Sequence, residues 1–429
     1  MRQIADLHIH SRFSRACSKE LTLANIDKTC RTKGVDIIAT GDFTFPDWFS
    51  GIKNELEEID NSGLYKLKAA SDDKLKFLLS TELALIYKKY DKCRRIHIVV
   101  HAPNIEAVQE LNNYLDKKYN IRSDGRPILG MGAEELCKLC FSIHPKFLIY
   151  PAHIWTPWFA VFGSKSGFDK MEECFGKYTK NIYAYETGLS SDPEMNWRLS
   201  ALDKLTLLSN SDAHSLPNIA REANVFELQK ISYDEIYNVV KNVERPKLGV
   251  STDKNKSFLD YTIEFYPEEG MYHLDGHRAC GARFTPEETK KHKGICPVCK
   301  KPLVIGVMYR VDELADRPLG FKPNNAHGYK KLVELDKIIA EALDMKSRTS
   351  KRVQAEYQNI IRQAGTEMTV LLDLPLGDLF KMTLPSVVEG VKRVREGNLH
   401  VEPGFDGQYG MVNIFNDEEK AENKQGKLF

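Results

Sequence analysis

Seven short apolar runs recur along the first half of the chain, and most of them precede a longer segment with helical spacing of apolar residues. Near-continuous apolar runs are typical of strands buried on both faces, as in a parallel sheet covered by helices or closed into a barrel. The intervening segments are long enough for crossover helices, for example over 25–34 and 169–178. We therefore expect an α/β fold with strands over 4–8, 35–42, 77–85, 96–101, 147–153, 182–186 and 205–212.

The pattern changes further along the chain, which divides into three predicted parts. The first part, 1–265, holds the seven strands. The second, 266–306, is rich in Gly, His, Cys and Pro and is expected to form a separate small module. The third, 307–429, is predicted to be mainly helical, with helices over 327–343 and 353–364 that carry apolar residues at helical spacing. Its charged C-terminal tail is expected to be flexible.

Composition narrows the classes of function. The chain has 429 residues, 42% of them apolar, a length that suits two or three domains with a large buried core. Lys and Arg total 61 against 60 for Asp and Glu, so any nucleic-acid site must be a local basic patch. No apolar run reaches about 18 residues and no export signal is visible, so we expect a cytoplasmic protein without membrane contact. The nine cysteines then suggest reduced thiols or metal ligands.

Potential metal ligands lie at or near the end of every predicted strand. Because parallel strands end at the same rim, such residues converge there although they are far apart in sequence. The imidazole and carboxylate groups are more than one ion needs, which predicts two or three divalent ions (Zn, Mn or Mg) bridged by carboxylates. The candidates are His8, His10, Asp42, Glu82, His101, His153, Glu186, Asp212 and His214.

The candidates rest on different arguments. His8 and His10 are two residues apart at a strand end, so both imidazoles point to the same side. Glu82 lies within an apolar run, where an unpaired charge is costly and a bound metal would explain it. Glu186 is either a ligand or a residue that orients one. Isolated histidines are expected at the surface or in structural hydrogen bonds, namely His97, His144 and His400.

A second group of metal-binding residues lies in the 266–306 segment. One histidine and three cysteines form two pairs there, each with a two-residue gap, a spacing typical of a zinc ribbon. The expected ligands of one structural Zn are His277, Cys280, Cys296 and Cys299. His273 and His292 are alternatives for the histidine ligand. Cys137 and Cys140 also have C-x-x-C spacing, but they lie on the apolar side of a predicted helix and are expected to be buried core residues.

Basic and aromatic residues suggest a polymeric substrate rather than a small phosphate ester, for which a zinc module has no evident use. Basic residues cluster in the module and between two C-terminal helices, where Lys351 and Arg352 are candidate phosphate contacts. Trp155 and Trp158 closely follow His153, so they either stack on a base at the catalytic rim or form a lid packed on the barrel.

Two motifs resemble those of the polymerase and histidinol phosphatase (PHP) metallo-phosphoesterase superfamily. Residues 6–11, Asp-Leu-His-Ile-His-Ser, look like its opening motif, and residues 210–214, Asn-Ser-Asp-Ala-His, look like its closing motif. The resemblance implies a distorted (β/α)7 barrel with a three-metal site. Where many members have Thr-Asp-His, this chain has Thr40-Gly-Asp-Phe. The third metal position would then be held differently, by Asp42 with His214, or be less tightly occupied.

Six segments distributed along the chain carry a second, more extensive resemblance, namely 6–11, 41–44, 186–197, 209–214, 275–278 and 402–406. With these segments, nearly the whole chain resembles the endonuclease Q family of lesion-specific nucleases. The resemblance implies incision of the phosphodiester 5′ to hypoxanthine, uracil, xanthine or an abasic site, leaving 3′-hydroxyl and 5′-phosphate ends.

On this interpretation, bound metals activate water and bind the scissile phosphate. The expected catalytic residues are Asp212, Glu82 and His10. The damaged nucleotide would be flipped into a pocket at the rim, where the loop from Glu186 to Asn196 is the candidate base reader. The expected ligand sets are His8, His10, Glu82 and Asp212 for one ion, Glu82, His101 and His153 for a second, and Asp42 with His214 for a third.

Two other functions are compatible with the sequence. A PHP-type phosphatase acting on a small phosphate ester would share the metal cluster but leave the zinc module without a role. A non-catalytic DNA-damage binding protein would keep the fold but would not need a full ligand set. In addition, the terminal segment from Gln425 to Phe429 faintly resembles a sliding-clamp binding motif, which would make the clamp a partner.

Overall fold

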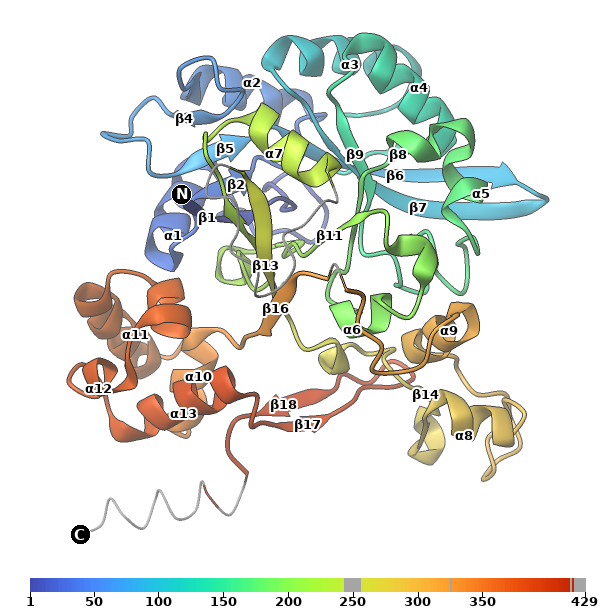
Figure 1. Ribbon diagram of the computed structural model, residues 1–429, viewed down its shortest axis with the longest axis vertical. Helices are drawn as coiled ribbons and strands as arrows, with labels where there is room; N and C mark the ends of the chain where they lie inside the picture. The colour runs from blue at the N-terminus through green and yellow to red at the C-terminus, as the bar shows by residue number, and fades with distance from the viewer. Residues whose placement is uncertain (243–255, 325, 417–418, 420–429) are drawn as a thin grey trace.

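The computed structural model describes residues 1–242, 256–324, 326–416 and 419, so the proposed clamp-binding segment from Gln425 to Phe429 lies outside it. The N-terminal part is an assembly of sheets with helices packed around it (Figure 1). The C-terminal helices and the small module lie on one side of this assembly, and the hairpin of β17 (His400–Glu402) and β18 (Met411–Asn413) runs between them (Figure 1). The fold is mixed α/β, as predicted.

All seven predicted strands are present. The third is interrupted only at Leu79, so that one strand continues into the next. The strands are β1 (Arg2–Asp6), β2 (Ile37–Ala39), β5 (Lys76–Leu78) with β6 (Ser80–Lys89), β7 (Lys92–His101), β9 (Leu148–Pro151), β10 (Ala184–Glu186) and β11 (Thr206–Leu208).

The strands pair in both directions. β1, β2 and β5 are parallel neighbours, and so are β10 and β11. Two further contacts close the strands into a ring. The segments that follow β1 and β11 are joined by a parallel bridge between Ile9 and Ala213, and the segment after β9 is joined to β10 by a hydrogen bond of 3.2 Å from Ile154 N to Glu186 O. However, β7 runs antiparallel to both β6 and β9, so the expectation of an all-parallel arrangement is wrong there.

Several strands were not predicted, and they extend the largest sheet on both sides. β12 (Ala223–Glu227) pairs antiparallel with β1, and β13 (Phe258–Glu264) pairs antiparallel with β12. On the other side, β4 (Tyr65–Leu67) and β3 (Leu56–Glu58) follow β5, while the short β8 (Ile128–Leu129) lies beside β6. These strands are short or carry polar residues, so their apolar pattern is weak.

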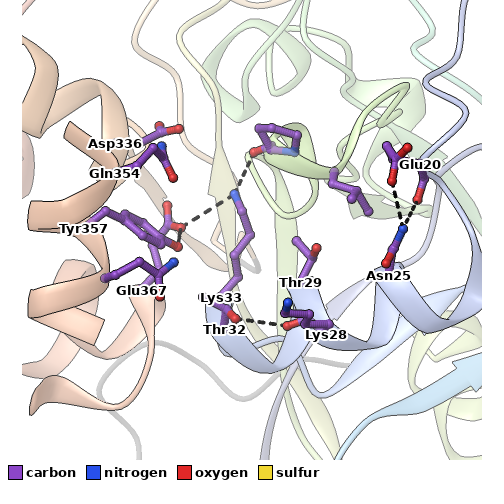
Figure 2. Close-up of a pocket in the computed structure, with 13 residues that line it drawn as sticks. Glu20, Asn25, Lys28, Thr29, Thr32, Lys33, Asp336, Gln354, Tyr357 and Glu367 are labelled. Atoms are coloured by element: carbon purple, nitrogen blue, oxygen red, sulfur yellow. Dashed lines mark hydrogen bonds and ion pairs between the residues drawn. The ribbon is translucent and has the colours of Figure 1, made fainter. Parts of the chain in front are cut away.

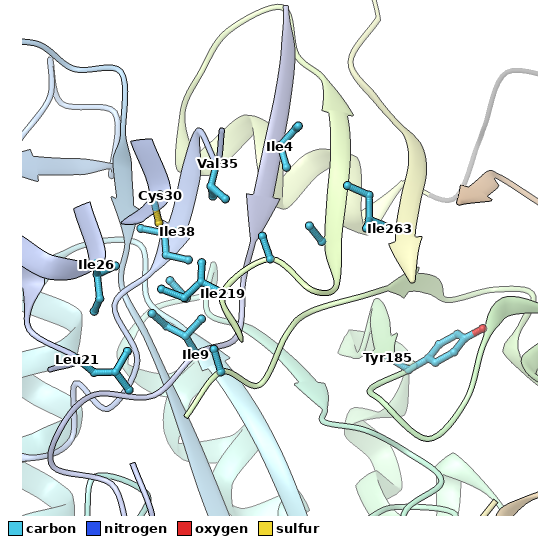
Figure 3. Packing of buried hydrophobic residues seen from close by; sticks show 14 of the residues in the cluster. Ile4, Ile9, Leu21, Ile26, Cys30, Val35, Ile38, Tyr185, Ile219 and Ile263 are labelled. Carbon is cyan, nitrogen blue, oxygen red and sulfur yellow. The ribbon is translucent and has the colours of Figure 1, made fainter. Parts of the chain in front are cut away.

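Successive residues of the central strands face two hydrophobic clusters, as the two-residue period of a strand requires. Ile4 and Ile38 belong to one cluster, whereas Ala5 and Ile37 belong to the other. Figure 3 shows the first cluster, in which strand residues pack against Ile26 of α1 (Leu23–Lys33). This packing fixes the strand ends that carry the candidate ligands.

Crossover helices cover the sheets. α4 (Ala133–Ile143) buries Cys137 and Cys140, as expected, and the segment predicted as a helix over 169–178 contains only the short α5 (Met171–Phe175) before a 3-10 turn. The other helices of this part are α2 (Pro46–Glu55), α3 (Ile105–Lys118), α6 (Pro193–Asn196) and α7 (Tyr233–Lys241).

The small module and the helical region follow β13. The helix predicted over 327–343 is only partly present, because its first residues form β16 (Gly328–Lys331), which pairs parallel with β13 at the sheet edge. The elements in order are β14 (Asp275–His277), β15 (Ala282–Phe284), α8 (Pro286–Lys291), α9 (Val307–Leu314), β16, α10 (Leu335–Ala342), α11 (Lys351–Ala364), α12 (Leu376–Leu379) and α13 (Pro385–Glu396).

The C-terminal helices contact α1 through a polar interface around a cavity of about 320 Å³ (Figure 2). Buried Lys33 donates to Pro217 O at 2.8 Å and lies 3.7 Å from Glu367 Oε2, which also accepts from Tyr357 at 2.7 Å. Asp336 lines the same cavity. Among the described residues, no helix combines the length and the apolar character that crossing a membrane requires.

Candidate metal centre

Four of the predicted ligands come together beyond the strand ends. His8 and His10 follow β1, Glu82 lies in β6 and Asp212 follows β11, and their ligand atoms lie within 4.8 Å of one another. His10 Nε2 is 3.1 Å from Asp212 Oδ1 and 3.2 Å from Glu82 Oε2. Residues separated by about half of the chain thus form one buried group.

The unpaired atoms of this group fit a metal ion. In the described part of the chain, His8 Nε2, His10 Nε2 and Asp212 Oδ1 are buried without a hydrogen-bond partner. An unsatisfied buried polar group costs about 1–3 kcal/mol, so three converging ones require a reason. Imidazole nitrogen and carboxylate oxygen are the donors that Zn and Mn accept, and a shared cation would satisfy all three atoms.

A second group shares Glu82 with the first. Glu82 Oε1 lies 2.7 Å from His97 Nδ1 and 3.2 Å from His153 Nε2, whereas Glu82 Oε2 faces His10. These three residues also bring their ligand atoms within 4.8 Å of one another. One carboxylate therefore stands between two candidate ion positions, the arrangement of a bridging ligand.

The structure places His97, not His101, in the second group. Because β7 runs antiparallel to its neighbours, its last residue, His101, lies opposite Ser80 and Leu148, at the starts of β6 and β9. His101 Nε2 instead hydrogen-bonds to Tyr150 Oη at 2.9 Å. The sequence interpretation of His97 as an isolated structural residue missed this position, since strand direction leaves no mark in the apolar pattern.

Two of the predicted ligands lie behind the histidines instead. His8 Nδ1 donates to Glu186 Oε2 at 2.9 Å, and His10 Nδ1 donates to Asp42 Oδ1 at 3.0 Å. Ser11 donates to Asp42 through both its backbone nitrogen and its hydroxyl. A carboxylate that accepts from Nδ1 orients the ring and directs Nε2 toward the ion site. Of the two roles considered for Glu186, this geometry matches the orienting one.

The third predicted ligand pair does not assemble among the described residues. His214 Nδ1 hydrogen-bonds to Asp212 O at 2.8 Å, and its ring lies 4.6 Å from that of His10. Asp42 is fully buried on the far side of His10 and is occupied by Ser11 and Ser14. Neither residue belongs to a group of converging ligand atoms.

Electrostatics favours ionised carboxylates in this site. Burial alone would raise the pKa of Glu82, but His97 and Arg126 outweigh it and hold this pKa well below its usual value. Burial would also raise the pKa of Asp212, but the nearby imidazoles of His10 and His8 outweigh it and hold this pKa well below its usual value. Burial lowers the pKa of His97 to about 4, so this ring is charged only in acid and is neutral near pH 7, as a ligand must be.

Backbone strain gathers at the same place. Asp42, His153 and Asp212 have φ values of 48°, 28° and 45°, in the left-handed region that residues other than glycine rarely adopt. Such conformations cost about 1–3 kcal/mol each and are retained mostly where function requires them.

The predicted zinc ligands also meet. His277 ends β14, Cys280 lies in the next turn, and Cys296 and Cys299 follow α8, with all four ligand atoms within 4.8 Å. Of the alternative histidines, His292 packs its ring against Phe284 at 5.0 Å, and His273 lines a separate cavity. Three thiols and one imidazole at these distances fit a tetrahedral zinc ion.

The predicted DNA contacts differ in accessibility. Trp155 is fully buried and donates to Asn196 at 2.8 Å, so its ring has no free face to offer a base. Trp158 is 42% exposed and packs edge-on against Tyr272. Asn196 and Glu186 are buried as well. Exposed residues at the start of α11 are Lys351 and Arg352.

A cavity of about 600 Å³ is lined in part by loops that follow residues of the centre. Two of its edges are formed by loops that leave the centre directly: Thr156 and Trp158 after His153, and Leu189 and Ser190 after Glu186.

Arg126 is a further residue of the centre that the sequence analysis missed, since nothing in the surrounding pattern signals a site. Arg126 donates to Glu82 Oε2 at 2.9 Å.

Comparison with known proteins identifies relatives of the whole chain and of parts of it. A sequence model of the MJ0043 C-terminal domain matches residues 334–398. The MJ0043 protein of Methanocaldococcus jannaschii is 32% identical over 261 residues, which are 60% of this chain but only 31% of that protein.

Two solved structures match nearly the full length. The lesion-specific endonuclease PfuEndoQ from Pyrococcus furiosus has 30% identity and a TM-score of 0.82, over 96% of this chain and 95% of that chain. Endonuclease Q in complex with a 27-mer duplex carrying an abasic lesion at the active site has 30% identity and a TM-score of 0.81, over 98% of both chains. The chain therefore belongs to the endonuclease Q family and is, as predicted, a metal-dependent DNA endonuclease, a phosphodiester hydrolase.

Proposed function

We propose that the chain incises DNA at deaminated bases (hypoxanthine, uracil or xanthine) and at abasic sites. It would hydrolyse the phosphodiester on the 5′ side of the lesion and leave 3′-hydroxyl and 5′-phosphate ends. The observation that carries the proposal is the pair of ligand groups joined by Glu82. The abasic duplex at the active site of an endonuclease Q relative supports the class of substrate.

We propose that the two groups hold divalent ions (Zn, Mn or Mg) in a PHP-type barrel. When bound, such ions activate water and neutralise charge on the phosphate. His8, His10, Glu82 and Asp212 would hold one ion, and Glu82 with His97 and His153 a second. Glu186 and Asp42 keep the imidazoles of His8 and His10 oriented, so that the ligand atoms are placed before the ions bind.

The cavity of about 600 Å³ is the proposed site of the flipped nucleotide. Two of the loops that line it follow His153 and Glu186, which supports a position near a phosphate bound at the centre. Trp158 supplies an accessible aromatic face for stacking. Weak pairing at a deaminated or abasic position lowers the cost of flipping, about a few kcal/mol, and so contributes selectivity.

Two further parts of the chain complete the proposal. One structural Zn held by His277 and the three cysteines would stabilise the module from residue 266 to 306. The region after residue 306 would contact DNA phosphates, with Lys351 and Arg352 as candidates because they are exposed at the same helix end. Clamp binding through the segment from Gln425 to Phe429 stays a prediction.

The test compares incision of duplexes that carry one hypoxanthine, one uracil, one abasic site or no lesion. We expect Asp212→Asn to slow incision at least about 1,000-fold, because metal ligands contribute several kcal/mol of transition-state stabilisation. Asp91→Asn is the matched control, since Asp91 is exposed in the β6–β7 turn. Equal rates for Asp212→Asn and the wild type would contradict the mechanism, and hydrolysis of a small phosphate ester without DNA incision would favour a phosphatase.

A further inference from the structure

Arg126 projects into the centre from the loop between α3 and β8. Its Nη1 donates to Glu82 Oε2 at 2.9 Å, on the same oxygen that faces His10. The side chain is 23% exposed, so the guanidinium contacts the buried centre and is also partly accessible to solvent. Among described residues, Glu82 is the one side chain to which this guanidinium hydrogen-bonds, which leaves other N–H groups for a ligand.

The loop is built to hold this arginine. Asp124 Oδ1 accepts from the backbone nitrogens of Arg126 and Arg15, at 3.0 and 3.2 Å. Gly125 donates to Phe13 O at 3.0 Å, and a Cβ at this position would collide with the carboxylate of Asp42. Only glycine allows the loop to approach the residue that orients His10 so closely. The following strand, β8, is anchored to β6 through Ile128.

The balance of charges around the centre indicates that the Arg126 guanidinium is available to bind an anion. Four carboxylates contact the imidazole rings of the candidate histidine ligands, and they balance the charge of two divalent ions. The guanidinium is then an excess positive charge beside two cations, which is unfavourable until an anion arrives. A DNA phosphodiester carries one negative charge and accepts paired N–H donors. The four carboxylates are those of Asp42, Glu82, Glu186 and Asp212.

We propose that Arg126 is a catalytic residue that donates hydrogen bonds to a non-bridging oxygen of the scissile phosphate. This inference rests on the proposed function and deepens it by naming the residue that receives the phosphate. The fork of N–H groups positions the phosphate against the ions and stabilises the negative charge that builds up during attack. The contact with Glu82 holds the guanidinium in place before the substrate binds.

The test uses Arg126→Ala, Arg126→Lys and the control Arg122→Ala. Arg122 lies on the same segment, but its side chain is 63% exposed and pairs with Asp116 away from the centre. For Arg126→Ala we expect kcat to fall about 100- to 1,000-fold on a hypoxanthine duplex, the loss typical of one transition-state donor. Arg126→Lys should recover part of this loss, because it keeps the charge without the fork. Arg122→Ala should match the wild type.

Two readouts separate this role from support of Glu82. Metal content per chain, measured by mass spectrometry, should be unchanged in Arg126→Ala. Calorimetric titration of the metal-loaded enzyme with inorganic phosphate should show at least tenfold weaker binding. Wild-type kcat and phosphate affinity in Arg126→Ala, or loss of metal with phosphate affinity retained, would overturn the proposal. If the wild type incises no lesion, the proposed function fails, while the phosphate titration still decides whether Arg126 binds the anion.

Discussion

The two ligand clusters of this molecule are built on opposite principles. The metal centre at the rim, formed by His8, His10, Glu82 and Asp212 with His97 and His153, draws its ligands from residues 8 to 212. It lies within packed sheets, where His8 and His10 each have a carboxylate partner. The cysteine cluster draws its ligands from His277 to Cys299, in a module (266–306) with few buried apolar residues, namely Tyr266, Pro267, Cys296 and Leu303. The metal centre at the rim is therefore shaped by the fold, whereas we expect the module to depend on a bound ion for its shape.

The largest effect should come from the cysteine cluster. We expect Cys299→Ser to abolish structural zinc binding and unfold the module, because such sites contribute about 10–16 kcal/mol in small zinc domains. Limited proteolysis should then cut near Lys290 to Lys301 while the N-terminal part stays intact. The exposed Cys93 offers the control Cys93→Ser. A module that resists protease without zinc would show that both clusters are shaped by packing.

At the metal centre, we expect that loss of a ligand lowers the incision rate but leaves the fold intact. We expect His97→Ala to lower incision more than about 100-fold, beyond the range usual for residues that only orient a ligand. His101→Ala should leave incision within about threefold and cost about 1–3 kcal/mol of stability, since it leaves Tyr150 Oη without its partner. Rates and thermal unfolding measured on both variants distinguish the two positions. The reverse pattern would restore His101 as the ligand.

The smallest expected effect is a change in the pH dependence of the free energy of unfolding of the metal-free protein, caused by Asp336. Burial raises the pKa of Asp336 from 3.8 to about 6 although Arg348 opposes the shift. The folded state then binds this proton more tightly than the unfolded state, so stability is lost as pH rises from about 4 to 6. In metal-free protein we expect Asp336→Asn to flatten this decline and to add about 1–3 kcal/mol at pH 7.

Urea unfolding at several pH values measures this change. Asp378→Asn is the control, because Asp378 is half-exposed and pairs only with Lys381 among described residues. A decline that persists unchanged in Asp336→Asn would assign it to another buried carboxyl.

The sequence predicted all seven strands of the N-terminal part, but only some of the residues that meet at the metal centre. Apolar runs located all seven strands, and strand ends located His8, His10 and Asp212, because both follow from local pattern. The direction of β7 is a property of its partners, so His101 and His97 were exchanged. Arg126 reaches the centre through a loop whose path depends on distant contacts, and no periodicity records such a path.

Aromatic residues show the same limit from another side. Trp155 and Trp158 have the same residue type and similar neighbours in the sequence. Only the packing shows that Trp155 is buried and hydrogen-bonded to Asn196, whereas Trp158 is exposed to solvent. Ligand chemistry can be read from residue type and spacing, but accessibility requires the whole fold.

The pairing of β16 with β13 means that the module leaves and re-enters the same sheet at adjacent strands. A module that is attached at both ends to neighbouring strands has less freedom of rotation than a domain attached by one linker, because its motion is restricted to rotation about the line through the two attachment points. Two neighbouring strands of one sheet thus provide both attachment points of the module.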